Sequence, residues 1–258
     1  CADLMLGLLL TAHRYAEQEG FPAELREPLE TCILNYPYTL DEPREDAALA
    51  EDLGIVGYAC QVLAGQRYPD RLFADSGQSG LWHQQRGEER AMAWLARRAY
   101  GGFTSWGSDV AFGGILPALL ALTDLASSEA LAELAAVLAD KVLFTLAGNS
   151  FKGVLGSPRG AARAASITDG RMQPTSPVSR LLWGMGSWNQ HSAAAIGLVA
   201  AELYGAPEIL GVVAADRLEE VWAREGHVAA WSGEGREAKP AQVVNIATYK
   251  TPDAMLSS

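Results

Sequence analysis

A cluster of arginines lies in one stretch of this sequence, from residue 148 to 179, where apolar residues show no helical spacing. The arginines in and beside this stretch are Arg159, Arg163, Arg171 and Arg180. Guanidinium groups bind carboxylates and phosphates through paired hydrogen bonds. A structureless stretch of this length inside a compact domain usually has a function or is mobile. The sequence therefore favours an anionic ligand here over a merely solvated loop.

Two shorter stretches without helical spacing carry aromatic and ionisable side chains. Residues 75–83 end in His83, and residues 100–114 contain Trp106 and Asp109. Trp106 could stack on a sugar or pack in the core, and Asp109 could serve a site or cap a turn. His83 fits a cleft and a surface loop equally well. Both interpretations stay open for each residue.

A third group precedes the apolar segment that starts near Ser192. Trp188, Asn189 and His191 follow one another closely there. Asn189 is a natural N-cap for a helix, which gives Asn189 and His191 a structural interpretation beside a functional one. Trp188, like Trp106, could present its ring to a sugar or bury it.

Composition excludes several classes of protein. The 258 residues include 31 acidic and 20 basic ones, and the net charge of −11 would repel a phosphate backbone, so nucleic acid is not an expected partner. The longest apolar runs fall well short of the roughly 20 residues that span a bilayer, so no membrane partner is expected. The three cysteines show no CxxC or Cys/His spacing. The sequence thus predicts neither a disulfide framework nor a metal site, and no cofactor is expected.

Apolar residues recur at helical spacing through most of the chain, which predicts a mainly α-helical fold. The predicted helices cover residues 3–18, 22–33, 45–64, 86–98, 112–125, 129–146, 192–204 and 207–222. Short connections make 112–146 and 192–222 antiparallel hairpins. His13, on the first helix, and His227, in a polar segment, are expected outside any site.

The C-terminal end changes character. Residues 243–249 are β-branched and aromatic, which predicts a strand. A linker is expected over 231–241, and the predicted domains cover residues 1–240 and 241–258. Because the chain opens on Cys1 and closes directly after a turn, we expect it to be a fragment of a longer protein.

Five segments together carry a resemblance to a known group of proteins. They are YACQVLAGQRYPD (58–70), GFTSWGSD (102–109), NSFKGVLGS (149–157), RLLWG (180–184) and TYKTPDAMLSS (248–258). They resemble large bacterial proteins that are similar in layout to the (α/α)-toroid polysaccharide lyases of the heparinase and alginate lyase type. The resemblance implies an incomplete toroid of helical hairpins in residues 1–240, followed by the first strand and turn of a β-sandwich.

The resemblance also implies a reaction, β-elimination on an acidic polysaccharide or oligosaccharide. Elimination requires a group that neutralises the uronate carboxylate, a base for the C5 proton and an acid for the leaving oxygen. The expected catalytic residues are His191, Tyr249 and Asn149. The expected substrate-binding residues are Trp106, Asp109, Arg159, Arg163, Trp188, Asn189 and His83.

Several positions depart from that group. The chain has Asp52 and Leu53 where the group has Asn and His, and Ser105 where it usually has Glu. It reads Arg159-Gly160-Ala161 instead of His-Gly-Arg, and Ala254 replaces a Tyr. A glycan-binding or scaffold toroid without catalysis is therefore the alternative. A glycoside hydrolase comes third, with Asp109 and either Glu51 or Asp52 as its carboxylate pair.

Overall fold

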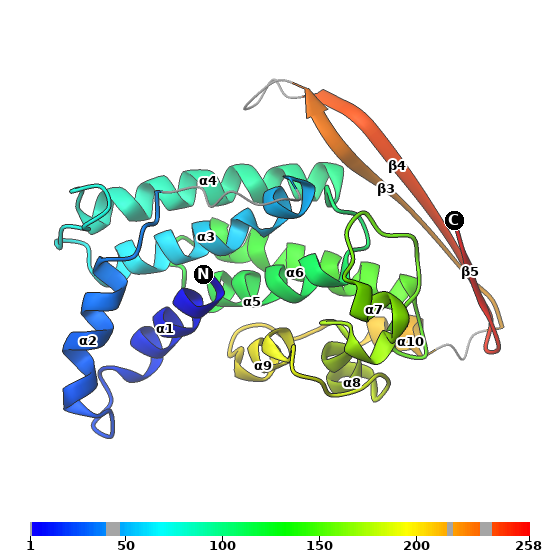
Figure 1. Cartoon of the computed structure of the whole chain (residues 1–258), viewed down its shortest axis with the longest axis horizontal. Helices are drawn as coiled ribbons and strands as arrows, with labels where there is room; N and C mark the ends of the chain where they lie inside the picture. Colours follow the sequence, from blue (N-terminus) through cyan, green and yellow to red (C-terminus); the bar gives the residue numbers. More distant parts are fainter. Residues whose placement is uncertain (1, 40–46, 216–218, 233–238) are drawn as a thin grey trace.

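The computed structural model describes residues 2–39, 47–215, 219–232 and 239–258. Helices make up most of these residues, and a small antiparallel sheet lies at the C-terminal end of the chain (Figure 1). The predictions of a mainly helical fold and of a β region near the C-terminus are thereby confirmed.

The helices and strands follow one another in this order. The first six helices are α1 (Ala2–Tyr15), α2 (Ala23–Leu34), α3 (Ala47–Arg67), α4 (Gly80–Gly101), α5 (Asp109–Leu125) and α6 (Glu129–Asn149). Next come β1 (Ser150–Phe151), β2 (Val154–Leu155), α7 (Ala164–Thr168), the 3-10 turn η1 (Gly170–Met172), α8 (Ser176–Trp183), α9 (Ala193–Ala200) and α10 (Ile209–Ala214). The last elements are β3 (Val221–Ser232), β4 (Lys239–Lys250) and β5 (Met255–Ser257), which form a sheet in that order.

Two helix pairs, α3 with α4 and α5 with α6, form the body of the molecule (Figure 1). The second pair confirms the hairpin predicted over 112–146, and the hydroxyl of Ser128 accepts a hydrogen bond from the Leu131 N–H at the start of α6. The two pairs meet because α3 packs against α5. Helix α1 covers α3, α9 covers α5 and α10 covers α6.

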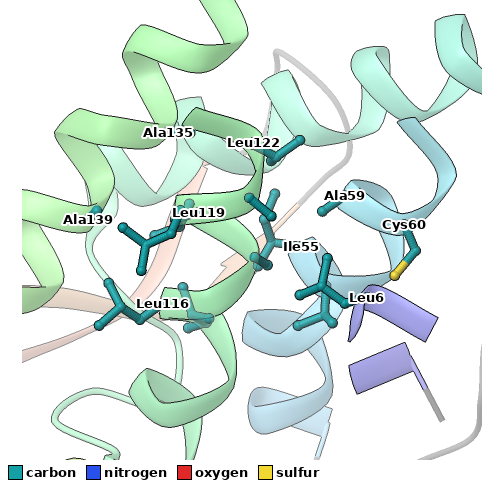
Figure 2. Packing of buried hydrophobic residues seen from close by; sticks show 14 of the residues in the cluster. Leu6, Ile55, Ala59, Cys60, Leu116, Leu119, Leu122, Ala135 and Ala139 are labelled. Carbon is teal, nitrogen blue, oxygen red and sulfur yellow. The ribbon is translucent and has the colours of Figure 1, made fainter. Parts of the chain in front are cut away.

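The hydrophobic core lies where these helices meet (Figure 2). Its labelled members include Leu6, Ile55, Ala59, Leu116, Leu119, Ala135 and Ala139, each at most 4% exposed. Burying each leucine or isoleucine side chain contributes about 1.5–3 kcal/mol relative to leaving it in water. The alanines among them keep the side chains short, so the helix axes approach closely.

Glycines bring α3 and α4 into backbone contact. A Cβ atom on Gly65 would lie 2.3 Å from the Gly80 carbonyl oxygen and 2.4 Å from the Gln84 nitrogen. On Gly87 it would lie 2.8 Å from the Val62 nitrogen. These glycines weaken the helices locally, and the close packing that they permit explains their presence.

Two predicted loops contain regular structure. Helix α4 begins at Gly80 instead of near residue 86, because the Ser79 hydroxyl accepts a hydrogen bond from the Trp82 N–H at 3.3 Å. His83 is therefore a helical residue, which corrects its assignment to a loop. The stretch 148–179 holds the β1–β2 hairpin, α7, η1 and the start of α8, so the prediction that it is structureless is also wrong.

The helices predicted over 192–204 and 207–222 are shorter than expected. Helix α9 ends at Ala200 because the carboxylate of Asp124 accepts hydrogen bonds from the Glu202 and Leu203 N–H groups, which turns the chain. Helix α10 covers only Ile209–Ala214. The two pack mainly on different helices, α9 on α5 and α10 on α6, and not on each other as the predicted antiparallel hairpin requires.

Strand β3 occupies a region where a helix and a linker were expected. It begins at Val221 and pairs with β4 from Val221 opposite Lys250 to Ser232 opposite Lys239. The strand predicted over 243–249 is confirmed as part of β4. Residues 233–238, in the middle of the expected linker, lie outside the described residues.

A buried lysine fastens the sheet to the helices. Lys250, on β4, is 1% exposed. Its Nζ donates hydrogen bonds to the carbonyl oxygens of Ala147, Ser150 and Val213 at 3.0–3.1 Å. Carbonyls near a helix C-terminus lack partners within the helix, and a cation there is stabilising. Lys250 thus caps α6 from the sheet.

The close packing of α3 on α4 predicts opposite effects for two glycine-to-alanine changes in α3. Gly65→Ala should lower the free energy of unfolding by about 1–3 kcal/mol, because the new methyl group would overlap the α4 backbone. Gly57→Ala is the matched control, since nothing lies within 4 Å of its added Cβ; it should stabilise the protein by up to about 1 kcal/mol. Urea denaturation measures both values, and equal stability of the two variants would contradict the packing.

Candidate functional site

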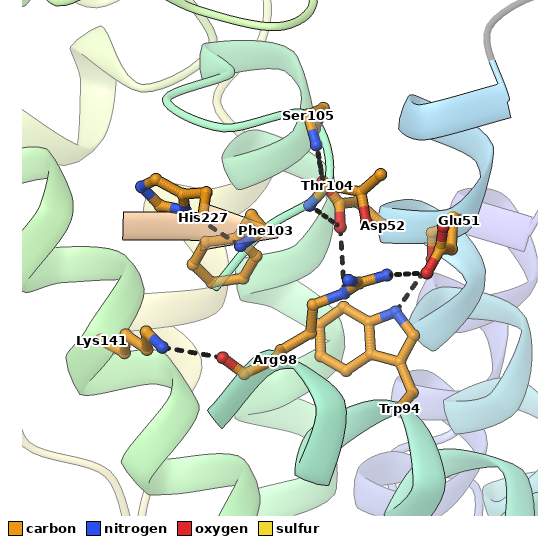
Figure 3. Close-up of polar contacts among 9 residues, drawn as sticks. All are labelled: Glu51, Asp52, Trp94, Arg98, Phe103, Thr104, Ser105, Lys141 and His227. Atoms are coloured by element: carbon orange, nitrogen blue, oxygen red, sulfur yellow. Dashed lines mark hydrogen bonds and ion pairs between the residues drawn. The ribbon is translucent and has the colours of Figure 1, made fainter. Parts of the chain in front are cut away.

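A buried ion pair joins α3 to α4 (Figure 3). Arg98 is 1% exposed and Asp52 is fully buried. The Arg98 Nε lies 3.0 Å from a carboxylate oxygen of Asp52, and its Nη2 donates to Glu51 at 2.7 Å. One guanidinium therefore binds two successive carboxylates of α3.

The other partners of Asp52 come from the loop between α4 and α5. The N–H groups of Thr104 and Ser105 donate to its two oxygens at 3.0 and 2.7 Å, and the Ser105 hydroxyl donates at 2.5 Å. Burial raises the pKa of Asp52, although Arg98 and these donors favour the charged form. The carboxylate thus fixes the loop on the two helices.

Two of the departures from the toroid-lyase pattern lie in contact with each other. The resemblance implies an amide at position 52 and a carboxylate at 105, and this chain has Asp52 and Ser105, joined by a hydrogen bond. In this chain a carboxylate at position 52 and a hydroxyl donor at position 105 satisfy each other.

Leu53, the next residue of α3, lines a cleft of about 290 Å³. The cleft takes Val110, Gly113, Gly114 and Pro117 from α5 and Asp3 and Leu6 from α1, and it is completed by Arg163, Pro174, Gln190, His191 and Ala193. Two of the predicted site residues, Arg163 and His191, therefore meet on one concave surface. We call this surface the cleft below.

Backbone contacts position both of these side chains. Arg163 directly precedes α7, and its carbonyl oxygen accepts hydrogen bonds from the N–H groups of Ser166 and Ile167. The His191 N–H donates to the Asn189 side-chain oxygen at 2.7 Å. Asn189 in turn donates to the carbonyl oxygens of Arg171 and Gln173, at 2.7 and 2.8 Å. Asn189 is therefore a positioning residue for His191. Asn189 was expected to be the N-cap of the following helix, but the N-cap of α9 is Ser192.

Arg159 and Asp109 form an ion pair next to the loop between α4 and α5. The Arg159 Nη1 lies 2.9 Å from the Asp109 carboxylate, and its Nη2 donates to the Leu155 carbonyl at 2.7 Å. Asp109 is fully buried at the start of α5, where Ser108 is the N-cap. Neither residue lines the cleft. The pair holds the chain after β2 against α5 and leaves neither charge unpaired.

The remaining predicted catalytic residues lie at the sheet. Asn149, 1% exposed, donates to Glu225 at 2.7 Å and accepts from the Thr248 hydroxyl at 2.6 Å. Tyr249 points to the other face of β4, where its ring packs 4.7 Å from that of Trp222. The two predicted catalytic side chains therefore do not join His191 in the cleft.

Histidines 83 and 227 are both buried, so His83 lies neither in the cleft nor in the surface loop considered for it. His83 is fully buried, with Nε2 2.7 Å from the Ser76 hydroxyl and its ring stacked on Phe73. Burial lowers the pKa of His83, which keeps the imidazole neutral. His227 is 2% exposed, and its Nδ1 accepts from the Phe103 N–H at 3.1 Å (Figure 3). Neither imidazole is available to a polysaccharide.

The two tryptophans differ in environment. Trp106 is half-buried beside Gly160, whose N–H donates to the Trp106 carbonyl at 2.9 Å. Trp188 is 61% exposed, three residues before His191. Trp188 can present its ring to a ligand, and Trp106 mainly packs.

Sequence reasoning missed the residues that complete the cleft and its support. Asp3 and Gln190 line the cleft, and Arg98 orders the neighbouring loop. Arg98 gives one usable signal, since a charged residue occupies a core-facing position near the end of a predicted helix. Asp3 and Gln190 carry no signal in a single sequence.

Within the described residues no three His, Cys, Asp or Glu side chains cluster as a metal site, and no helix there is long and apolar enough to cross a bilayer. Comparisons of the chain with family models, with curated proteins and with solved structures gave no match. The resemblance to toroid lyases therefore stays a prediction.

The buried pair predicts a large stability loss when one partner is removed. Arg98→Met should lower the free energy of unfolding by about 3–5 kcal/mol at pH 7.5, because Asp52 would stay buried without its cation. Arg86→Met, which breaks the exposed Arg86–Glu89 pair on the same helix, should cost less than about 1 kcal/mol.

Acid should partly rescue the Arg98→Met variant. Loss of the cation raises the pKa of Asp52 further, so the folded state binds a proton more readily than the unfolded state, and stability rises as pH falls. The deficit relative to wild type, measured by urea denaturation, should be smaller at pH 5.5 than at pH 7.5. A deficit that is independent of pH would show that Arg98 acts through packing alone.

Proposed function

We propose that the cleft binds an acidic glycan and that the protein is a carbohydrate-active domain of the polysaccharide-lyase type. The observation that carries this proposal is the meeting of Arg163 and His191 on one concave surface. A cation beside a titratable imidazole is the minimum that elimination next to a uronate requires.

Each of the two side chains has a distinct role in this proposal. Arg163 pairs with the uronate carboxylate, which makes the neighbouring C5 proton more acidic. His191 removes that proton as the general base. The C4–O bond then breaks, a C4=C5 double bond forms, and the imidazolium returns the proton to the leaving oxygen.

Two neighbouring residues support substrate binding. Gln190 lines the cleft and offers an amide to sugar hydroxyls. Trp188, exposed on the same loop, offers an apolar face to a sugar ring.

Binding without turnover is the second candidate, and specific observations favour it. Leu53 places an apolar side chain on the cleft where the resemblance implies an imidazole. Asn149 and Tyr249 are engaged at the sheet. A hydrolase receives less support, because Asp52 and Asp109 are each buried against an arginine of their own.

The architecture in this proposal is an incomplete (α/α) toroid. Successive antiparallel pairs, α3 with α4 and α5 with α6, are the repeating unit of such a fold, and the C-terminal sheet fits the start of a β domain. Residues 1–240 and 241–258 remain the proposed division, although β3 already pairs with β4 across it.

Substitutions in the cleft separate binding from catalysis. Arg163→Gln should weaken binding of a uronate oligosaccharide roughly tenfold or more, because a charged hydrogen bond is lost. His191→Gln should leave binding nearly unchanged and lower the rate of elimination by about 10²–10⁴. Calorimetry measures binding, and the ultraviolet absorbance of the unsaturated sugar end measures elimination.

Arg171→Gln is the matched control, since Arg171 is exposed, pairs with Asp169 and lies outside the cleft lining. It should bind and react like wild type. Binding without any new absorbance in wild type would select the binding-only candidate. Release of reducing ends without unsaturation would select hydrolysis, and no binding of any acidic glycan would refute the proposal.

A further inference from the structure

We propose that Asp3 makes the cleft selective for glycans in which a single uronate is flanked by neutral sugars. This inference rests on the proposed function and narrows its substrate class. Among the described residues that line the cleft, Arg163 brings the one guanidinium and Asp3 the one carboxylate. The cleft can therefore attract one anionic group and has a like charge ready to repel a second.

A ligand can reach both of these charged side chains. Asp3, Arg163 and Gln190 are all exposed to solvent. Asp3 lies in the first turn of α1, three residues before Leu6, so both side chains face the cleft from the same side of the helix. Leu6 is only 4% exposed. Leu6 therefore belongs to the base of the cleft and Asp3 to its mouth.

Neither charge is paired within the described part of the chain. No hydrogen bond or ion pair joins the Asp3 carboxylate or the Arg163 guanidinium to another described residue. The two line one cleft, and yet they do not pair with each other. Arg159 and Asp109, by contrast, are consumed by their mutual ion pair. The charges of Asp3 and Arg163 therefore remain available to a ligand.

The floor of the cleft offers no second position for an anion. A Cβ atom on Gly114 would lie 2.5 Å from the Leu53 side chain, and one on Gly113 would lie 2.6 Å from Pro174. These contacts close the floor with apolar atoms. His191, as the proposed base, enters the reaction neutral and adds no cation. The described lining therefore provides one place for a carboxylate, at Arg163.

Asp3 affects a neutral and an acidic neighbouring sugar in opposite ways. A carboxylate accepts hydrogen bonds from sugar hydroxyls and repels a second carboxylate. Since one cleft of about 290 Å³ holds Asp3 and Arg163, both act on the same short stretch of ligand, within about one Debye length, ~8 Å at 0.15 M salt. A neutral sugar beside the bound uronate gains a hydrogen bond there, whereas a second uronate meets a like charge.

Calorimetric titration of the whole chain with two matched trisaccharides tests the proposal. One trisaccharide has a glucuronate between two glucoses, and the other has three glucuronates with the same linkages. At constant ionic strength set with chloride, the wild-type chain should bind the singly charged trisaccharide roughly tenfold more tightly than the triuronate. Equal affinities, or tighter binding of the triuronate, would overturn the proposal.

Asp3→Asn should remove most of this selectivity. The amide no longer repels a carboxylate, and it keeps a hydrogen-bonding group of the same size. The affinity for the triuronate should rise roughly tenfold, while the affinity for the singly charged trisaccharide should change by less than about threefold. Far-UV circular dichroism checks that the variant is folded. Unchanged selectivity in the folded variant would count against Asp3 and overturn the proposal.

Glu133→Gln is the matched control, because it removes the same charge from an exposed position on α6 outside the cleft lining. This variant should keep the selectivity of the wild type. An equal loss of selectivity in both variants would overturn the proposal in favour of repulsion by the whole chain, whose net charge is −11.

The Arg163→Gln variant separates this inference from the proposed function. Weaker binding of both trisaccharides by this variant, together with a wild-type selectivity that Asp3→Asn removes, supports both. If Arg163→Gln weakens binding but the wild type does not prefer the singly charged trisaccharide, the proposed function stands and this inference is overturned. If the wild type binds neither trisaccharide, the proposed function fails and this inference fails with it.

Discussion

The structure depends above all on keeping the charges of Arg98 and Asp52 together inside the protein. Taking either charge out of water alone would cost several kcal/mol, so α3, α4 and the loop at 102–108 must hold one arrangement. Three successive residues of α3 take part in this arrangement: Glu51 and Asp52 bind Arg98, and Leu53 lines the cleft. The ion pair therefore fixes one wall of the cleft.

Polar contacts also attach the sheet to the helices. Asn149 binds Glu225 and Thr248, His227 accepts from the Phe103 N–H, and Lys250 caps α6. Each of these groups is buried and satisfied, so separating the sheet from the helices would leave several of them without partners. The sheet and the α6 terminus are thus expected to unfold together.

Local signals in the sequence predicted the helices best. The apolar spacing identifies α5 and α6, because this signal acts within a few residues. The end of α9 depends on Asp124, which lies far away in the sequence, and no local pattern shows it. Strand β3 was missed because its alternation includes small residues such as Ala223 and Gly226, which weaken a period of two.

The candidate site could be predicted only in part, because it also depends on contacts between residues far apart in the sequence. Residue type alone indicated Arg163 and His191, and the fold brings them together. The fold holds Asn149 in a buried hydrogen-bond network and turns Tyr249 to the opposite face of β4. The positions of both side chains depend on burial and on strand register, which a single sequence does not show. His83 carries the right chemistry but is enclosed by Phe73 and Ser76.

The buried Lys250 limits which insertions and deletions β4 can accept. Side chains alternate between the two faces of a strand, so Ile246, Thr248 and Lys250 face the helices while Asn245, Ala247 and Tyr249 face away. Inserting or deleting one residue between Val243 and Lys250 would turn the lysine outward and leave the Ala147 and Ser150 carbonyls without their donor. The length of this strand between Val243 and Lys250 is therefore fixed to the residue.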